Sequence, residues 1–183
     1  MVIPDVLTAA VVEPVREDSA NRVAALFDAH HERLYRLARR LTSSHEDARD
    51  VVQDTFVRAA QRIGGVPAGT SSGEAWLVRV LVNICRDRWR QRATRARLDA
   101  TVLPPPASAR SDEAALVARD TIWRALERLP MKRRAALVMF ELEGAPIDQI
   151  ASTLGMNPIT VRWHLSRGRR ELAQWIRESH THA

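Results

Sequence analysis

Residues 146–176 read PIDQIASTLGMNPITVRWHLSRGRRELAQWI, and this stretch decides the fold of the C-terminal part of the chain. Apolar residues at helical spacing are followed by Gly155, which favours the end of a helix. Asn157 and Pro158 then favour the start of another helix. A short helix, a glycine turn and a capped helix make up the helix-turn-helix pattern, so the sequence predicts this motif here.

The helix that begins at Pro158 is expected to have an apolar face and a basic face. Gly168 lies on the apolar face, where we expect it to allow close packing, because a glycine inside a helix otherwise costs about 1 kcal/mol. The outward face carries arginine, which matches guanine edges and phosphate oxygens, and an aromatic residue that is costly to leave in water. We therefore favour DNA binding over an ordinary solvated face. The candidate residues are Thr160, Arg162, Trp163, Ser166, Arg167 and Arg170.

Apolar periodicity toward the N-terminus predicts a first domain of three helices over residues 19–92, preceded by an extension, residues 1–18, to which we assign no role. Trp76 and Trp89 are expected to turn inward on the third helix. The second and third helices are expected to open at capping boxes, which pair Ser43 with Glu46 and Ser71 with Glu74.

A linker is predicted over residues 93–111, because helical periodicity stops there and residues 104–106 are consecutive prolines. A second domain over residues 112–178 would then contain two helices before the helix-turn-helix. The expected fold class is therefore all-α, with two small helical domains joined by a flexible proline-containing linker.

Composition narrows the class of protein. The net charge of +6 favours polyanionic partners, although Lys132 is the only lysine and a nucleotide bias toward arginine explains the charge equally well. Cys85 is the only cysteine, so no intrachain disulfide forms and a reducing compartment is expected. The first residues lack the pattern of a signal peptide, and no apolar run is long enough for a membrane span. We expect a cytoplasmic protein without membrane insertion.

The third helix carries a polar stripe whose residues recur at i, i+4, i+7 and i+11. Such a stripe suits contacts with nucleic-acid phosphates and base edges. It is equally compatible with the surface of any helix in an arginine-rich protein, and the residues alone leave both interpretations open. The stripe consists of Arg79, Asn83, Arg86 and Arg90.

The second helix places Asp47, Asp50 and Asp54 on one face, with Gln53 alongside. An acidic face repels DNA, so its functional interpretation is a docking surface for a protein that presents arginines. The alternative is an ordinary solvated face whose charge is offset by Arg49 and Arg58.

Catalytic motifs are lacking in the sequence. There is no glycine-rich nucleotide loop, no Cys/His set at metal-ligand spacing and no nucleophile motif. The histidines, including His30 and His31, are expected to lie at the surface rather than to bind metal. We therefore predict no enzymatic activity, no catalytic residue, no metal and no cofactor.

Taken together, the segments resemble the extracytoplasmic-function sigma factors, the smallest members of the main bacterial sigma-factor family. Residues 47–56, DARDVVQDTF, resemble the family's D-A-x-D-x-x-Q-[DE]-x-F segment, and residues 76–87, WLVRVLVNICRD, resemble its W-L-x-x-I-x-x-N-x-x-x-D segment. Leu129-Pro130, Ile150-Ala151 and residues 160–169, TVRWHLSRGR, resemble its second domain. The resemblance runs from about residue 24 to residue 176 in the family's order and spacing.

The resemblance implies a role for each candidate surface. The first domain would be sigma domain 2, whose Asp47, Asp50, Gln53 and Asp54 dock on the clamp helices of the largest subunit of core RNA polymerase. Arg79, Asn83, Arg86 and Arg90 would lie on the side of this domain that binds the unpaired strand of the promoter minus-ten element, with a flipped base held by the loop at residues 63–72.

The second domain would be sigma domain 4, whose last helix reads the minus-thirty-five element as duplex. This domain would also bind the flap of the second-largest polymerase subunit, and the linker would thread toward the RNA exit path. An anti-sigma factor is a further expected partner. Trp163, His164 and Gly168 depart from the residues usual in the family, so its base preference does not transfer to this chain.

Two other classes of protein remain open on the residues alone. A self-sufficient helix-turn-helix regulator would bind a specific duplex without polymerase, as a dimer on symmetric half-sites. A pure protein-interaction module would leave the outward arginines of the last helix without a function.

Overall fold

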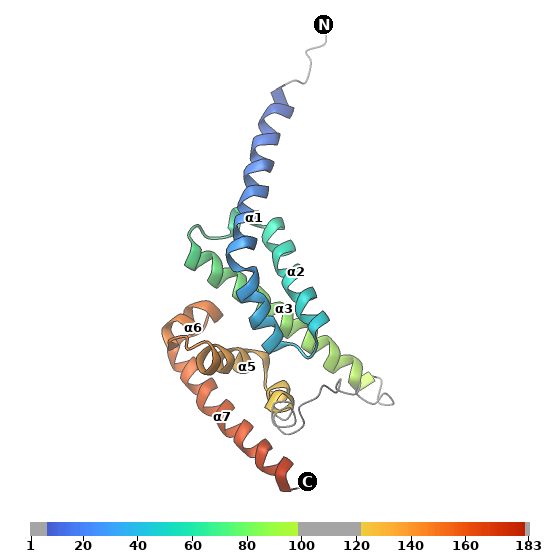
Figure 1. Ribbon diagram of the computed structural model, residues 1–183, viewed down its shortest axis with the longest axis vertical. Helices are drawn as coiled ribbons and strands as arrows, with labels where there is room; N and C mark the ends of the chain where they lie inside the picture. The colour runs from blue at the N-terminus through green and yellow to red at the C-terminus, as the bar shows by residue number, and fades with distance from the viewer. Residues whose placement is uncertain (1–6, 99–121, 182–183) are drawn as a thin grey trace.

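The computed structural model describes residues 7–98 and 122–181, and every regular element in these ranges is helical. This confirms the all-α prediction. The helices lie in two groups (Figure 1), and the N-terminal end of α1 and the C-terminal end of α7 project toward opposite ends of the molecule. The elements are α1 (Leu7–Leu41), α2 (His45–Gln61), η1 (Ile63–Gly65), α3 (Thr70–Leu98), a helix over 122–128, α5 (Met131–Leu137), η2 (Val138–Leu142), α6 (Ile147–Leu154) and α7 (Pro158–Thr181).

The first group consists of α1, α2 and α3, which pack around fully buried leucines that include Leu34, Leu37 and Leu77. The start of α2 differs from the prediction by one residue. Ser44, and not Ser43, is the N-cap, and its hydroxyl accepts a 3.0 Å hydrogen bond from the main-chain N–H of Asp47. The predicted capping box is therefore wrong in register, although both serines are followed by an acid at the required spacing.

Three features of α3 also differ from expectation. Glu74 does not close a box with Ser71, because its carboxylate binds Arg33 of α1 at 2.5 Å. Trp89 was expected to turn inward, but it is 40% exposed. The helix continues to Leu98, so the predicted start of the linker falls within α3. The rest of that linker and the first part of the helix predicted after residue 112 lie outside the described residues.

The helix-turn-helix is formed by α6 and α7, as predicted. Gly155 ends α6 in the left-handed conformation, with φ of 61°, and the side-chain oxygen of Asn157 accepts a 2.8 Å hydrogen bond from the N–H of Ile159. The close-packing role of Gly168 is confirmed as well. A Cβ atom at this position would lie 2.6 Å from Cδ1 of Leu137 on α5, so α5 and α7 approach too closely for any other residue without a shift.

The two groups of helices share one continuous core, in which α3 packs against α5 and α6. Buried and half-buried charges reinforce this contact. Arg134 of α5 donates to the main-chain oxygens of Leu41, at the end of α1, and of Glu127. Glu143, which follows η2, pairs with Arg33 at 3.2 Å and with Arg40 at 3.7 Å, both on α1. The structure is thus a closed arrangement of the two domains.

Among the helices in the described ranges, none combines the length and the apolar character that a bilayer span requires.

The surface position expected for His30 is wrong. Its side chain is buried, and Nδ1 lies 4.0 Å from a carboxylate oxygen of Glu74. This histidine therefore belongs to the packing between α1 and α3.

Candidate nucleic-acid interface

The outward face of α7 is a basic and exposed candidate surface. Val161, Leu165 and Gly168 are buried against α5 and α6, which fixes the rotation of the helix about its axis. The predicted DNA-binding residues consequently all lie on exposed positions, and Trp163 is 51% exposed. The exposed positions are Thr160, Arg162, Trp163, Ser166, Arg167 and Arg170.

Interactions along α7 hold part of this face in place. The guanidinium carbon of Arg133, on α5, lies 5.1 Å from the centroid of the Trp163 ring, and Arg133 also binds the carboxylate of Glu171. Arg167 donates to the same carboxylate at 2.8 Å, and this hydrogen bond, with that from Arg133, holds the pKa of Glu171 below its usual value. Arg170 donates to the hydroxyl of Ser166. Trp163 and Arg167 are therefore oriented by neighbours before any ligand binds.

The polar stripe on α3 is only partly free. Arg79 reaches across to the second domain, where its Nη2 donates to the main-chain oxygen of Ser152 at 2.7 Å and its Nε to that of Thr153 at 3.1 Å. Because these oxygens belong to the last turn of α6, the guanidinium caps the negative end of that helix. Asn83 and Arg86 are half-buried, and Arg90 is exposed. Arg86 pairs with the adjacent Asp87 at 3.1 Å.

The acidic residues of α2 are offset by arginines of α3. Arg88 lies 2.8 Å from Asp54 and 3.7 Å from Asp50, and Arg92 pairs with Asp47. The alternative interpretation, an acidic face offset by Arg49 and Arg58, named neither of these partners, because both lie on a different helix. Asp50 is nevertheless 63% exposed, and Gln53 beside it is exposed. The α2 face therefore offers hydrogen-bonding groups to a partner, but with much of its negative charge neutralised.

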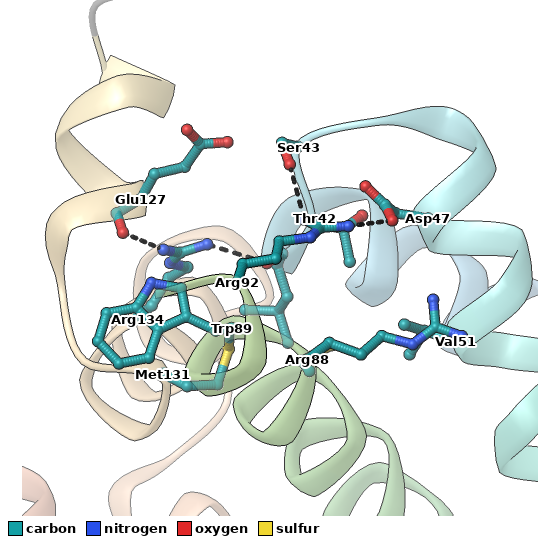
Figure 2. A pocket seen from close by; sticks show the side chains of 12 residues that line it. Thr42, Ser43, Asp47, Val51, Arg88, Trp89, Arg92, Glu127, Met131 and Arg134 are labelled. Carbon is teal, nitrogen blue, oxygen red and sulfur yellow. Dashed lines mark hydrogen bonds and ion pairs between the residues drawn. The ribbon is translucent and has the colours of Figure 1, made fainter. Parts of the chain in front are cut away.

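A cavity of about 240 Å³ lies where the two domains meet, between the ends of α1 and α3, the start of α2, the helix over 122–128 and α5. Figure 2 shows Arg92 reaching Ser43 and Asp47 on one side of it, while Arg134 reaches Glu127 on the other. Cys85 lines the cavity, and burial raises the pKa of its thiol to about 12. This thiol is therefore protonated at neutral pH and is a poor nucleophile.

Sequence analysis missed two residues of the candidate nucleic-acid interface around Trp163. Ile159 is 72% exposed at the start of α7, on the same face as Trp163. The helical spacing that selected Trp163 also selects Ile159, so the signal was present. Arg133 was missed because nothing in the sequence links it to a ring on another helix.

Comparison with known proteins gives the family. Sigma-70 region 2 matches residues 26–95, and Sigma-70 region 4 matches residues 119–172. The chain is 35% identical over 157 residues to the ECF RNA polymerase sigma factor SigE of Mycolicibacterium smegmatis, covering 80% of the chain and 58% of that relative. It is 34% identical over 151 residues to the ECF RNA polymerase sigma factor SigM of Mycobacterium tuberculosis, covering 82% of the chain and 75% of that relative.

Solved structures agree on the fold. The sigma factor RpoE in complex with the anti-sigma factor NepR, from Bartonella quintana, superposes with a TM-score of 0.60 at 22% identity, over 90% of this chain and 98% of that one. CnrH in complex with the cytosolic domain of CnrY gives a TM-score of 0.59 at 23% identity, over 89% and 97% of the two chains.

These matches, with the helix-turn-helix and the helical first domain, place the chain in the family of ECF RNA polymerase sigma factors. The region 2 match covers α2 and most of α3, and the region 4 match covers α5, α6 and most of α7.

Proposed function

We propose that this chain binds core RNA polymerase in the cytoplasm and directs it to promoters, with each domain contacting a separate element of the DNA. The observation that carries the proposal is the outward face of α7, where Trp163 lies opposite the side that is buried against α5 and α6 and exposed arginines lie around it. In a helix-turn-helix the second helix enters the major groove with such a face toward the base edges. The α7 face would contact the base edges of the minus-thirty-five element, which would be double-stranded.

The α2 face would bind the clamp helices of the largest polymerase subunit. Exposed Asp50 and Gln53 support this role, because both can accept hydrogen bonds from arginines of a partner. Arg88 already neutralises part of the charge, so specific hydrogen bonds would contribute more than long-range attraction. The second domain would bind the flap of the second-largest subunit.

The α3 stripe would bind the unpaired strand of the minus-ten element once the domains separate. Arg79 is engaged by Ser152 and Thr153 in the closed arrangement, so its guanidinium must leave these oxygens before it can contact phosphate. Polymerase would supply the free energy for this separation by binding each domain at a distant site, while the linker keeps the domains tethered. Nucleotide hydrolysis is not required, because contacts of the unstacked base with the loop at residues 63–72 would offset the few kcal/mol that unstacking costs.

An anti-sigma factor is proposed as a further partner. The similar sigma factor RpoE was solved with the anti-sigma factor NepR, which supports this class of regulator here. The partner would hold the chain away from polymerase until a signal releases it.

Run-off transcription tests the proposal. Core RNA polymerase from the bacterium that encodes the chain would be incubated with and without the purified protein on a library of genomic fragments, and transcript starts would be mapped. We expect new starts that share an upstream element and depend on the protein. The proposal fails if the protein adds no starts, or if it binds a specific duplex at nanomolar concentration without polymerase, as a self-sufficient regulator does.

Matched variants separate the two surfaces. Arg162→Ala should reduce transcript yield by weakening promoter binding by about 1–3 kcal/mol, whereas Arg39→Ala, at an exposed position of α1, should not. Asp50→Ala should weaken binding to core polymerase in the absence of DNA. Glu32→Ala removes the same charge from an exposed ion pair on α1 and should leave polymerase binding unchanged.

A further inference from the structure

Ile159 is the most exposed large apolar side chain in the described residues, at 72%. It lies in the first turn of α7, four residues before Trp163, which is itself 51% exposed. Isolated exposed isoleucines are common on proteins, but an isoleucine and a tryptophan adjacent on one helix face form a continuous apolar surface that is costly to hydrate. The contacts proposed for the arginines of α7 do not explain why this apolar surface is exposed.

The position of the surface on α7 follows from helical geometry. Ile159, Trp163, Ser166 and Arg170 are spaced i, i+4, i+7 and i+11, and so share one face of the helix. The inward series of Val161, Leu165, Gly168 and half-buried Leu172 has the same spacing but begins two residues later, about 200° around the helix axis. Ile159 and Trp163 therefore point directly away from the domain core.

The backbone at Ile159 and the ring of Trp163 are held in place. The N–H of Ile159 donates to Oδ1 of Asn157 at 2.8 Å, which fixes the backbone of the first turn. The ring of Trp163 packs edge-on against that of His164, with centroids 5.0 Å apart, and Arg133 covers part of it. An ordered apolar surface loses little conformational freedom on binding, which favours a specific contact.

We infer that Ile159 and Trp163 form a ridge that contacts the C5-methyl groups of thymines in the major groove, and so determines the preference of this chain for thymine within its upstream promoter element. The inference rests on the proposed function of α7. Charge complementarity selects DNA as the occupant, because Arg162 and Arg167 flank the ridge and Arg170 follows it on the same face, all at exposed positions that attract phosphates. The methyl of thymine is the apolar group that the major groove presents to such a ridge.

Replacing thymine by uracil tests the inference, because it removes the methyl group and leaves base pairing intact. The probe is a duplex selected by the reconstituted holoenzyme from a library randomised over the upstream element, and then resynthesised with uracil at single thymines. With wild-type protein, uracil at a contacted position should weaken holoenzyme binding about three- to fivefold, as expected for burial of one methyl group. The selected duplexes should contain a thymine at that position.

The Ile159→Ala variant completes the test. On the thymine duplex it should bind more weakly by a similar factor, and it should no longer distinguish thymine from uracil at one position. The Ile122→Ala variant is the matched control, since Ile122 is 48% exposed in the same domain but lies outside α7. It should retain the full difference between thymine and uracil. Thermal unfolding of both variants checks that the fold is intact.

The possible outcomes are distinct. If Ile159→Ala keeps the wild-type difference at every thymine, or if uracil has no effect on the wild-type protein, the ridge does not read methyl groups. A ridge that instead binds a protein, such as an anti-sigma factor, gives this same result, and the inference is overturned. If the holoenzyme enriches no sequence at all and starts no transcript, the proposed function fails together with the inference.

Discussion

Arg134 on α5 donates a hydrogen bond of 2.9 Å from Nη1 to the main-chain oxygen of Leu41, the last residue of α1. The two residues belong to different domains. The contact places a buried positive charge at the end of α1, where helix carbonyls lack partners and the helix dipole is negative. Burial lowers the pKa of Arg134, but an arginine remains charged at neutral pH.

Removing this side chain should destabilise the closed protein. We expect Arg134→Ala to lower the free energy of unfolding by about 2–4 kcal/mol, because two main-chain oxygens lose a buried donor. Arg39→Ala removes an exposed arginine of α1 and should change stability by less than about 0.5 kcal/mol. Denaturant unfolding followed by circular dichroism measures both values. Equal values for the two variants would contradict the role assigned to Arg134.

Glu143 should help to keep the domains together. Its carboxylate is only 13% exposed and pairs with Arg33 and Arg40 of α1, whereas Glu141 pairs with Arg169 within the second domain. We expect Glu143→Ala to increase the radius of gyration measured by small-angle X-ray scattering, because the domains separate more often. Glu141→Ala is the control and should scatter like the wild type. An unchanged radius for Glu143→Ala would show that this ion pair does not hold the domains together.

Gly168→Ala should destabilise the helix-turn-helix despite the higher helix propensity of alanine. The added Cβ would meet Leu137 at 2.6 Å and Arg133 at 3.1 Å. Overpacking of this kind outweighs the gain in propensity, and we expect a net loss of about 1–2 kcal/mol in thermal unfolding. Gly64→Ala is the control, because no atom lies within 4 Å of the position its Cβ would take. A stabilised Gly168→Ala variant would mean that α5 and α7 can separate at little cost.

Cys85 should resist alkylation in the folded protein. Burial raises its thiol pKa to about 12, so at pH 8 only about one thiol in 10,000 is ionised, and the thiolate is the reactive form. Iodoacetamide labelling followed by mass spectrometry should be much slower in buffer than in denaturant. Because Cys85 is the only cysteine, every carbamidomethyl group attached to sulfur in a thioether with cysteine reports on this site. Equal rates in the two conditions would show that the cavity opens freely.

The local signals in the sequence are sufficient for the helix-turn-helix. Gly155 takes the left-handed conformation that ends α6, and Asn157 caps α7, because both effects act over a few residues. The start of α2 was less determined. Ser43 and Ser44 are both followed at the right spacing by an acid, so the local pattern allows either serine as the cap, and the structure has Ser44.

The packing between the domains was not predictable. Arg79 binds the main-chain oxygens of Ser152 and Thr153, and every residue carries such an oxygen, so no side chain identifies the partner. The ion pairs of Arg88 with Asp50 and Asp54 also join two helices, and helical spacing within one element says nothing about them. Sequence patterns therefore identified the candidate surfaces, while their neutralisation and occlusion required the structure.

The central claim, that the chain opens promoter DNA only together with polymerase, is tested most directly by permanganate footprinting on a mapped promoter. Permanganate oxidises unpaired thymines. Holoenzyme containing the wild-type chain should make thymines in the minus-ten element reactive, whereas the chain alone and core polymerase alone should not. Reactive thymines produced by the chain without polymerase, or none produced by the holoenzyme, would contradict the account.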